Sequence, residues 1–184
     1  MAREKLVLTY EDYRRMPEAR VRNELFGGDL SVTPAPTPYH QRIVRRLASV
    51  LGAHADEHGV GEVLTAPIDV VLSPTDVVQP DIVVIRTDRL AIVGAEAIQG
   101  VPDLIIEVLS PATAARDRGR KKETYERFGV ADYWILDPEN RTLEMYHLEG
   151  RAYRMAARVD QDALHATLFP GLAVDLNSLW KAHT

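Results

Sequence analysis

The sequence predicts an α/β or α+β fold in which a mixed central β-sheet is flanked by helices. Two helical patterns, at residues 40–58 and 117–128, alternate with short runs rich in Val, Ile and Leu. Those runs are bounded by Pro, Gly or Ser, as strands usually are. The 184 residues contain no internal repeat or low-complexity linker, so we expect one domain over residues 1–184.

The N-terminal third begins with a short helix. Thr9 is a good N-cap residue, and the helix should run to about Met16, where Pro17 interrupts it. Residues 23–30 predict two short strands around a Gly-Gly turn. Pro stands at every second position from residue 34 to residue 38, which predicts an extended connector.

The first long helix is expected to start near His40 and to end at Gly59. Its apolar positions follow the spacing of an amphipathic helix and are Ile43, Val44, Leu47, Val50 and Leu51. After Gly59 the pattern changes to that of strands, which we expect at residues 62–72, 81–86, 104–109, 133–136, 143–147 and 153–158. A second helix should span residues 117–128, and a last helical turn residues 176–180.

The composition excludes several classes of protein. There is no Cys, which rules out a disulfide scaffold, a thiolate nucleophile and a Cys-ligated metal. Lys and Arg number 22 against 27 Asp and Glu, so the net charge is −5 and any contact with nucleic acid must use a local patch. Charged residues interrupt every apolar run before membrane-spanning length, so we expect a cytoplasmic protein without membrane contact.

One candidate metal site is the segment His54-Ala55-Asp56-Glu57-His58, which has the H-x-x-E-H spacing of a zinc peptidase helix. Histidines four residues apart share a helix face and could hold one ion, with Glu57 acting on a water. Both histidines also continue the apolar face of the helix, and no third ligand stands in a recognisable motif. A structural role is therefore favoured over a zinc site.

A second candidate is the pair Asp81 and Glu107, which stand at the start of one apolar strand and inside another. A carboxylate in such a run is costly unless it is paired or binds a cation. If the two strands are neighbours, both carboxylates can reach one ion of the size of Mg²⁺. Asp103 repeats the Pro-Asp dipeptide, but it lies four residues before Glu107 on the same strand, which is too far to share a metal.

Lys121 supplies a cation for this pair. Lys121 and Tyr125 are four residues apart on an inward helix face, and Asp117, one turn earlier, could cap the helix or hold the lysine. Residues 116–127 contain six Lys or Arg and three acids, a local net charge of +3. Such a segment could face phosphate, but the sequence alone favours an ordinary solvated helix.

These residues, in this order, resemble the Uma-two family of restriction endonucleases with a PD-(D/E)XK core, which is abundant in bacteria. The likeness rests on Pro80-Asp81-Ile82-Val83-Val84, on Glu107-Val108-Leu109-Ser110-Pro111-Ala112-Thr113 and on Gly129-Val130-Ala131-Asp132-Tyr133-Trp134-Ile135-Leu136-Asp137-Pro138. Asn23-Glu24-Leu25-Phe26-Gly27-Gly28-Asp29-Leu30, His40 and Phe169-Pro170-Gly171-Leu172 extend it toward both ends.

The resemblance implies a restriction-endonuclease-like fold and a Mg²⁺- or Mn²⁺-dependent endonuclease that cuts DNA. Asp81 and Glu107 would bind the metal with help from the Val108 carbonyl, and Lys121 would be the active-site lysine. Glu24, Asp117 and Tyr125 would be accessory residues. The usual E-x-K lysine position holds Leu109, so Lys121 from the following helix must replace it.

One alternative stays open beside the zinc peptidase. The same fold could be a catalytically inactive module that binds nucleic acid or protein. A two-fold homodimer would suit the cutting of both strands of a duplex. The sequence contains no recognition helix or base-reading motif that would define the substrate sequence, DNA against RNA, or single against double strand.

Overall fold

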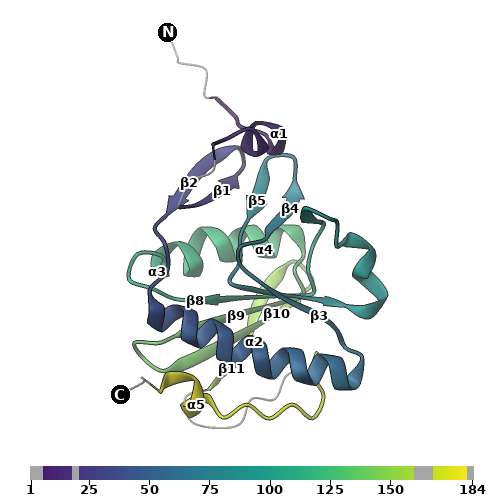
Figure 1. The fold of residues 1–184 in the computed structure, drawn as a ribbon, viewed down its shortest axis with the longest axis vertical. Helices are drawn as coiled ribbons and strands as arrows, with labels where there is room; N and C mark the ends of the chain where they lie inside the picture. Colours follow the sequence, from purple (N-terminus) through teal and green to yellow (C-terminus); the bar gives the residue numbers. More distant parts are fainter. Residues whose placement is uncertain (1–5, 18–20, 160–167, 182–184) are drawn as a thin grey trace.

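The computed structural model describes residues 6–17, 21–159 and 168–181, which form two β-sheets with helices packed against them (Figure 1). The larger sheet has six strands in the order β11-β10-β9-β8-β6-β3. Its strands in chain order are β3 (Gly61–Thr65), β6 (Ile82–Arg86), β8 (Leu104–Val108), β9 (Asp132–Asp137), β10 (Thr142–Glu149) and β11 (Ala152–Val159). Only β8 and β9 run parallel within it, so the expected mixed central sheet is confirmed.

A second sheet of five strands, in the order β2-β1-β5-β4-β7, was not predicted as a separate layer. It comprises β1 (Arg22–Phe26), β2 (Asp29–Thr33), β4 (Asp69–Ser73), β5 (Asp76–Val78) and β7 (Ala97–Gln99). Strands β1 and β2 are the expected pair around the Gly-Gly turn, where Gly27 and Gly28 have φ of 57° and 79°. β5 and β7 have three residues each, which is too few for a readable hydrophobic pattern.

The single strand expected at residues 62–72 is wrong. The structure divides this stretch into β3 and β4, which belong to different sheets. Pro67 lies between them and has no backbone N–H to donate to a ladder, so pairing stops there. The chain thereby passes from the six-stranded sheet to the five-stranded one.

The helices begin at residues whose side chains cap them. In α1 (Tyr10–Arg14), Thr9 and Asp12 exchange hydrogen bonds in a capping box. In α2 (Pro38–His58), the Thr37 hydroxyl accepts a hydrogen bond from the His40 amide, and Gly59 ends the helix with φ of 64°. The shorter helical segments are η1 (Thr87–Ile92), α3 (Ala114–Arg116), η2 (Asp117–Lys121), α4 (Lys122–Phe128) and α5 (Leu176–Trp180).

The six-stranded sheet has a hydrophobic core on each face. α2 and α5 cover one face, where Leu47 and Leu51 pack with Ile106 and Trp134. On the other face Tyr125 of α4 packs with Ile105 and Tyr133, and residues of the five-stranded sheet join the same cluster (Figure 1). No helix within the described ranges is long and apolar enough to cross a membrane.

The second predicted helix starts earlier than expected. Helical structure begins at Ala114 rather than Asp117, and residues 117–121 form a π-helical turn that leads into α4. Asp117 therefore lies within the helical segment and does not cap it. π-helical turns often mark functional positions, and this one carries both Asp117 and Lys121 toward the sheet.

Candidate active site at the end of strands β6 and β8

Asp81 and Glu107 lie side by side on neighbouring antiparallel strands. Ile82 of β6 pairs with Ile106 of β8. Because the strands are antiparallel, the next pair of opposite residues is Asp81 and Glu107. Directly opposite residues of such a pair have Cβ atoms about 4.5–5.5 Å apart. Both side chains are buried, with exposed fractions of 2% and 1%. The expectation that the two strands are neighbours is confirmed.

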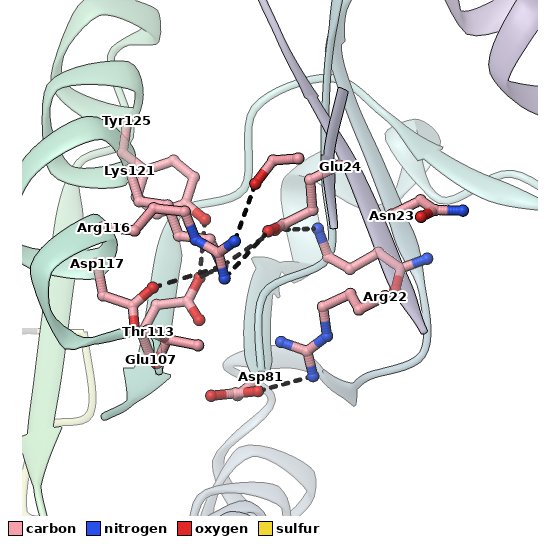
Figure 2. A network of polar contacts seen from close by, with 12 residues as sticks. Arg22, Asn23, Glu24, Asp81, Glu107, Thr113, Arg116, Asp117, Lys121 and Tyr125 are labelled. Carbon is pink, nitrogen blue, oxygen red and sulfur yellow. Dashed lines mark hydrogen bonds and ion pairs between the residues drawn. The ribbon is translucent and has the colours of Figure 1, made fainter. Parts of the chain in front are cut away.

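Asp81 is held by groups from three other elements. Its Oδ1 accepts a hydrogen bond from Arg22 of β1 at 2.9 Å, and its Oδ2 accepts one from the Val108 amide at 2.9 Å (Figure 2). His40 Nε2 of α2 lies 3.1 Å from the same Oδ2. Burial acts to raise the pKa of Asp81, but His40, Arg22 and the nearby Lys121 lower it to about 2, so the carboxylate is ionised near neutral pH.

The Val108 carbonyl faces the same point as Asp81. His40 Nε2 lies 2.9 Å from that carbonyl and 3.1 Å from Asp81 Oδ2. Both neighbours are acceptors, so Nε2 carries the hydrogen and donates to them. The predicted backbone ligand and the predicted carboxylate therefore converge on one place, at the first turn of α2.

The Glu107 side chain points toward the helical segment formed by η2 and α4. Its Oε1 accepts hydrogen bonds from Lys121 Nζ and from the Tyr125 hydroxyl, each at 2.8 Å (Figure 2). Tyr125 was expected to pack under the lysine, and it also binds the same carboxylate. Lys121 and Tyr125 reach Glu107 because they lie one helical turn apart on the buried face of the helix.

Lys121 is a buried cation surrounded by acids, with an exposed fraction of 1%. Its Nζ lies 2.8 Å from Glu107, 3.0 Å from Glu24 and 3.8 Å from Asp117 (Figure 2). These carboxylates raise the pKa of Lys121 although burial acts to lower it. Glu24 is fixed in turn by the Gln79 amide at 3.0 Å. Five of the six residues named as catalytic or accessory therefore meet around Lys121, and Asp81 lies beside them with partners of its own in Arg22, His40 and the Val108 amide.

The network holds more negative than positive charge. Burial and the nearby Asp81, Asp117 and Glu24 raise the pKa of Glu107 to about 8, although Lys121 acts to lower it. Burial likewise raises the pKa of Asp117, which Lys121 only partly offsets. Glu107 is therefore largely protonated at neutral pH while no further cation is bound.

The residues present fit a divalent cation of the Mg²⁺ type. Within the described part of the chain, no three His, Asp or Glu side chains form a ready metal cluster. The predicted set, however, is two carboxylates and one backbone carbonyl, all oxygen donors of the kind that Mg²⁺ prefers. Glu24 Oε2 and Asp117 Oδ1 are buried nearby without a hydrogen-bond partner. An added cation would offset the excess negative charge that keeps Glu107 protonated.

The basic segment at residues 116–127 is neither a free phosphate-binding patch nor a simply solvated face. Five of its six cations contact carboxylates, and the sixth, Lys122, lies over the Tyr146 ring. The pairs are Arg116 with Glu24, Arg118 with Asp137 and Glu144, Arg120 with Asp29, Lys121 with Glu24, Glu107 and Asp117, and Arg127 with Asp76. Its charge is used to join elements of the fold.

Two cavities lie on either side of His40. One of about 260 Å³ is lined by Arg22, residues 33–37 and residues 110–113. The other, of about 390 Å³, is lined by Tyr39 and Leu109 and also by Arg118, Asp137 and Glu139. His40, Thr37 and Ser110 contribute to both cavities. The candidate site is therefore reached from two directions.

The other candidates fall outside this site. His54 and His58 stack on each other, with ring centroids 4.0 Å apart, and His54 also packs against Phe169. No third ligand accompanies them among the described residues. Asp103 accepts a hydrogen bond from the Arg89 guanidinium at 2.7 Å and another from the Arg86 backbone amide. These side chains have structural partners that account for their positions.

Sequence reasoning did not name Arg22 as a site residue, and it noted His40 only through the family likeness. A signal for Arg22 existed, because it stands two residues before Glu24 and so faces the same side of β1. His40 could have been noticed as a buried-face residue in the first turn of an amphipathic helix. Neither pattern, however, indicates which distant strand the side chain will meet.

A mixed sheet with helices on both faces, a buried Asp and Glu at the paired ends of two adjacent strands, and a buried Lys from the following helix define a restriction-endonuclease-like fold. A solved structure shares it: that of "a putative nuclease belonging to DUF820" from Anabaena variabilis ATCC 29413. The two are 18% identical, the match covers 94% of this chain and 97% of that chain, and the TM-score is 0.77. A search of curated proteins finds no match.

The family is shown by the sequence itself. Residues 10–177 match the model of the Uma2 family, described as "Putative restriction endonuclease". The chain belongs to this family. The match includes every residue of the Asp81, Glu107 and Lys121 network.

Proposed function

We propose that this protein is a metal-dependent endonuclease that hydrolyses phosphodiester bonds in DNA. Asp81, Glu107 and the Val108 carbonyl would hold Mg²⁺ or Mn²⁺. One observation carries the proposal: Asp81 Oδ2 and the Val108 carbonyl meet the same His40 nitrogen, beside a second buried carboxylate. Membership of a restriction endonuclease family supports an enzyme that acts on nucleic acid.

The residues divide into those that bind and those that position. A divalent ion bound there supplies a water of lowered pKa and positive charge for the scissile phosphate. Asp81 is ionised and ready to bind, because its donors already hold its pKa low. Glu107 must lose its proton to bind, which ties metal affinity to pH. His40 keeps the Asp81 and Val108 oxygens directed at one point.

Lys121 would orient the attacking water or stabilise charge that develops on the phosphate. Its ammonium has three N–H donors, and Glu107 and Glu24 lie within hydrogen-bond distance of it. The third donor faces Asp117 at 3.8 Å, beyond hydrogen-bond distance, and would turn to a water or a phosphate oxygen when substrate binds. This supports Lys121 as the substitute for the lysine that Leu109 displaces. Tyr125 fixes Glu107 and has a pKa raised well above its usual value, so it acts as a donor.

Cleavage assays test the proposal directly. Wild type should cut DNA only with Mg²⁺ or Mn²⁺, and Asp81→Asn, Glu107→Gln and Lys121→Met should each lose activity by orders of magnitude. Asp103→Asn is the matched control, because Asp103 is also a buried acid after Pro but lies outside the network. RNA and single-stranded DNA belong in the same assay, since they define the substrate. No cleavage of any nucleic acid with any metal would refute the enzyme proposal.

The proposal also includes an oligomeric state, a two-fold homodimer, and a location, the bacterial cytoplasm. A two-fold homodimer would bring two sites to one duplex, and analytical ultracentrifugation with and without DNA measures it. The family likeness and the lack of a membrane-spanning helix among the described residues support action in the bacterial cytoplasm. Fractionation of cells that express a tagged chain checks this location.

A further inference from the structure

The smaller cavity beside Asp81 carries polar groups that the proposed metal chemistry leaves unused. It measures about 260 Å³, which is below the ~300–1,000 Å³ of sites that enclose a whole small molecule. Its polar lining comes from three segments of the chain, namely Arg22, then Thr33, Thr37 and His40, and then Ser110 and Thr113. A cavity of this size suits a single charged group.

Two buried atoms of this lining have no hydrogen-bond partner among the described residues. They are Thr33 Oγ1 and His40 Nδ1, and both side chains are more than nine-tenths buried. Buried polar atoms are almost always paired, so the unpaired Thr33 hydroxyl on this cavity indicates a missing acceptor. His40 Nδ1 is an acceptor while Nε2 carries the hydrogen, so it would pair with a water beside the ligand rather than with an anion. His40 donates to Asp81 and Val108 through its other nitrogen, so the same ring borders the metal ligands and the cavity.

The charge of the cavity selects an anion. Arg22 is its cation, and no Asp or Glu is among the residues that line it. The larger cavity across His40 differs, because Asp137 and Glu139 line it. Arg22 also binds Asp81 at 2.9 Å, so the cavity opens directly beside the proposed metal site. A guanidinium surrounded by hydroxyl groups is a good receptor for phosphate oxygens.

We propose that this cavity binds a second phosphate group of the nucleic-acid strand, next to the phosphate that is cleaved. Arg22 supplies the charge, and Thr33 and Ser110 supply hydroxyl donors. The inference rests on the proposed nuclease function and extends it to the position of the strand. The phosphate has two sources, an internal phosphodiester or a terminal 5′-monophosphate, and these give different substrate preferences.

Oligonucleotide binding in EDTA tests this inference apart from cleavage and metal binding. Fluorescence anisotropy would follow a short single strand, with a 5′-phosphate or a 5′-hydroxyl, against wild type, Thr33→Val and Thr142→Val. Thr142 is the matched control, because its Oγ1 is also buried and unpartnered but belongs to β10, away from the cavity. Ser110→Ala serves if Thr33→Val melts early.

Thr33→Val should weaken binding about tenfold, the loss of one hydrogen bond to a charged group, and Thr142→Val should not change it. Preference for the 5′-phosphate in wild type, lost in Thr33→Val, assigns a terminal phosphate. An equal loss of affinity for the 5′-phosphate and the 5′-hydroxyl oligonucleotide assigns an internal phosphate. Equal binding by wild type and both Thr33→Val and Ser110→Ala overturns the inference, as does a wild type that cuts DNA but binds no strand here. If the protein binds the oligonucleotide but no metal ion, the nuclease proposal is overturned and the phosphate-binding inference stands.

Discussion

Replacing Lys121 with Met should destabilise the protein far more than the loss of one side-chain charge at the surface. The ammonium is 1% exposed and lies within 3.0 Å of both Glu107 and Glu24. Removing one partner of a buried ion pair costs about 3–5 kcal/mol, because the charge of the other partner, here Glu24, stays buried without its cation. Met fills a similar volume, so little of this cost comes from a cavity. The loss would be a large part of a typical ~5–15 kcal/mol free energy of unfolding.

Urea unfolding at pH 5 and pH 8 measures this prediction. Without Lys121, Glu107 and Asp117 stay protonated in the folded state to higher pH than in the unfolded chain. Stability therefore falls as pH rises, and the cost of the substitution should be larger at pH 8. Lys122→Met is the control, because Lys122 lies over the Tyr146 ring face, a contact worth about 0.5–1 kcal/mol. Equal, pH-independent losses for the two variants would refute the buried-cation account.

Three further predictions concern the same network. Because the pKa of Glu107 is raised to about 8, wild-type stability should fall as pH rises from about 4.5 to 8, by at most ~1.4 kcal/mol per pH unit. Glu107→Gln should flatten that part of a urea-unfolding profile, and parallel profiles would contradict it. Because the pKa of Asp81 is lowered to about 2, its stabilisation is present above about pH 4 and lost as pH falls toward 2. Asp81→Asn should lack this acid loss in thermal melts, whereas an unchanged acid limb would show that other groups cause it. Tyr125→Phe removes one hydrogen bond to Glu107 and should cost about 1.5 kcal/mol, and a Tm equal to that of wild type would show the bond contributes nothing.

The sequence indicated Asp81, Glu107 and Lys121 as candidate site residues because their signals are local. Asp81 and Glu107 interrupt apolar strands, and such acids need a partner wherever the strands lie. Lys121 and Tyr125 share a helix face at i and i+4, so one contact implies the other. What joined these signals into one site was that β6 and β8 are neighbours, which only the structure shows.

The parts that sequence reasoning missed depend on contacts between distant segments. β5 and β7 gain strand structure by pairing with neighbouring strands, β5 with β1 and β4 and β7 with β4, since three residues have no period of their own. The basic run at residues 116–127 has the pattern of a solvent-exposed helix face. The acids that pair with its arginines lie on β1, β2, β9 and β10 and at the start of β5. Arg22 and His40 likewise become site residues only when their elements close over Asp81.

The most direct test of the central claim is calorimetric titration of Mn²⁺ into wild type and Glu107→Gln at pH 8. Wild type should bind the ion at one site and release a proton, because Glu107 must ionise to join Asp81 and Val108. Glu107→Gln should lose this binding, whereas Asp103→Asn should keep it. Equal binding by wild type and Glu107→Gln, or no binding by a folded wild type, would contradict the account.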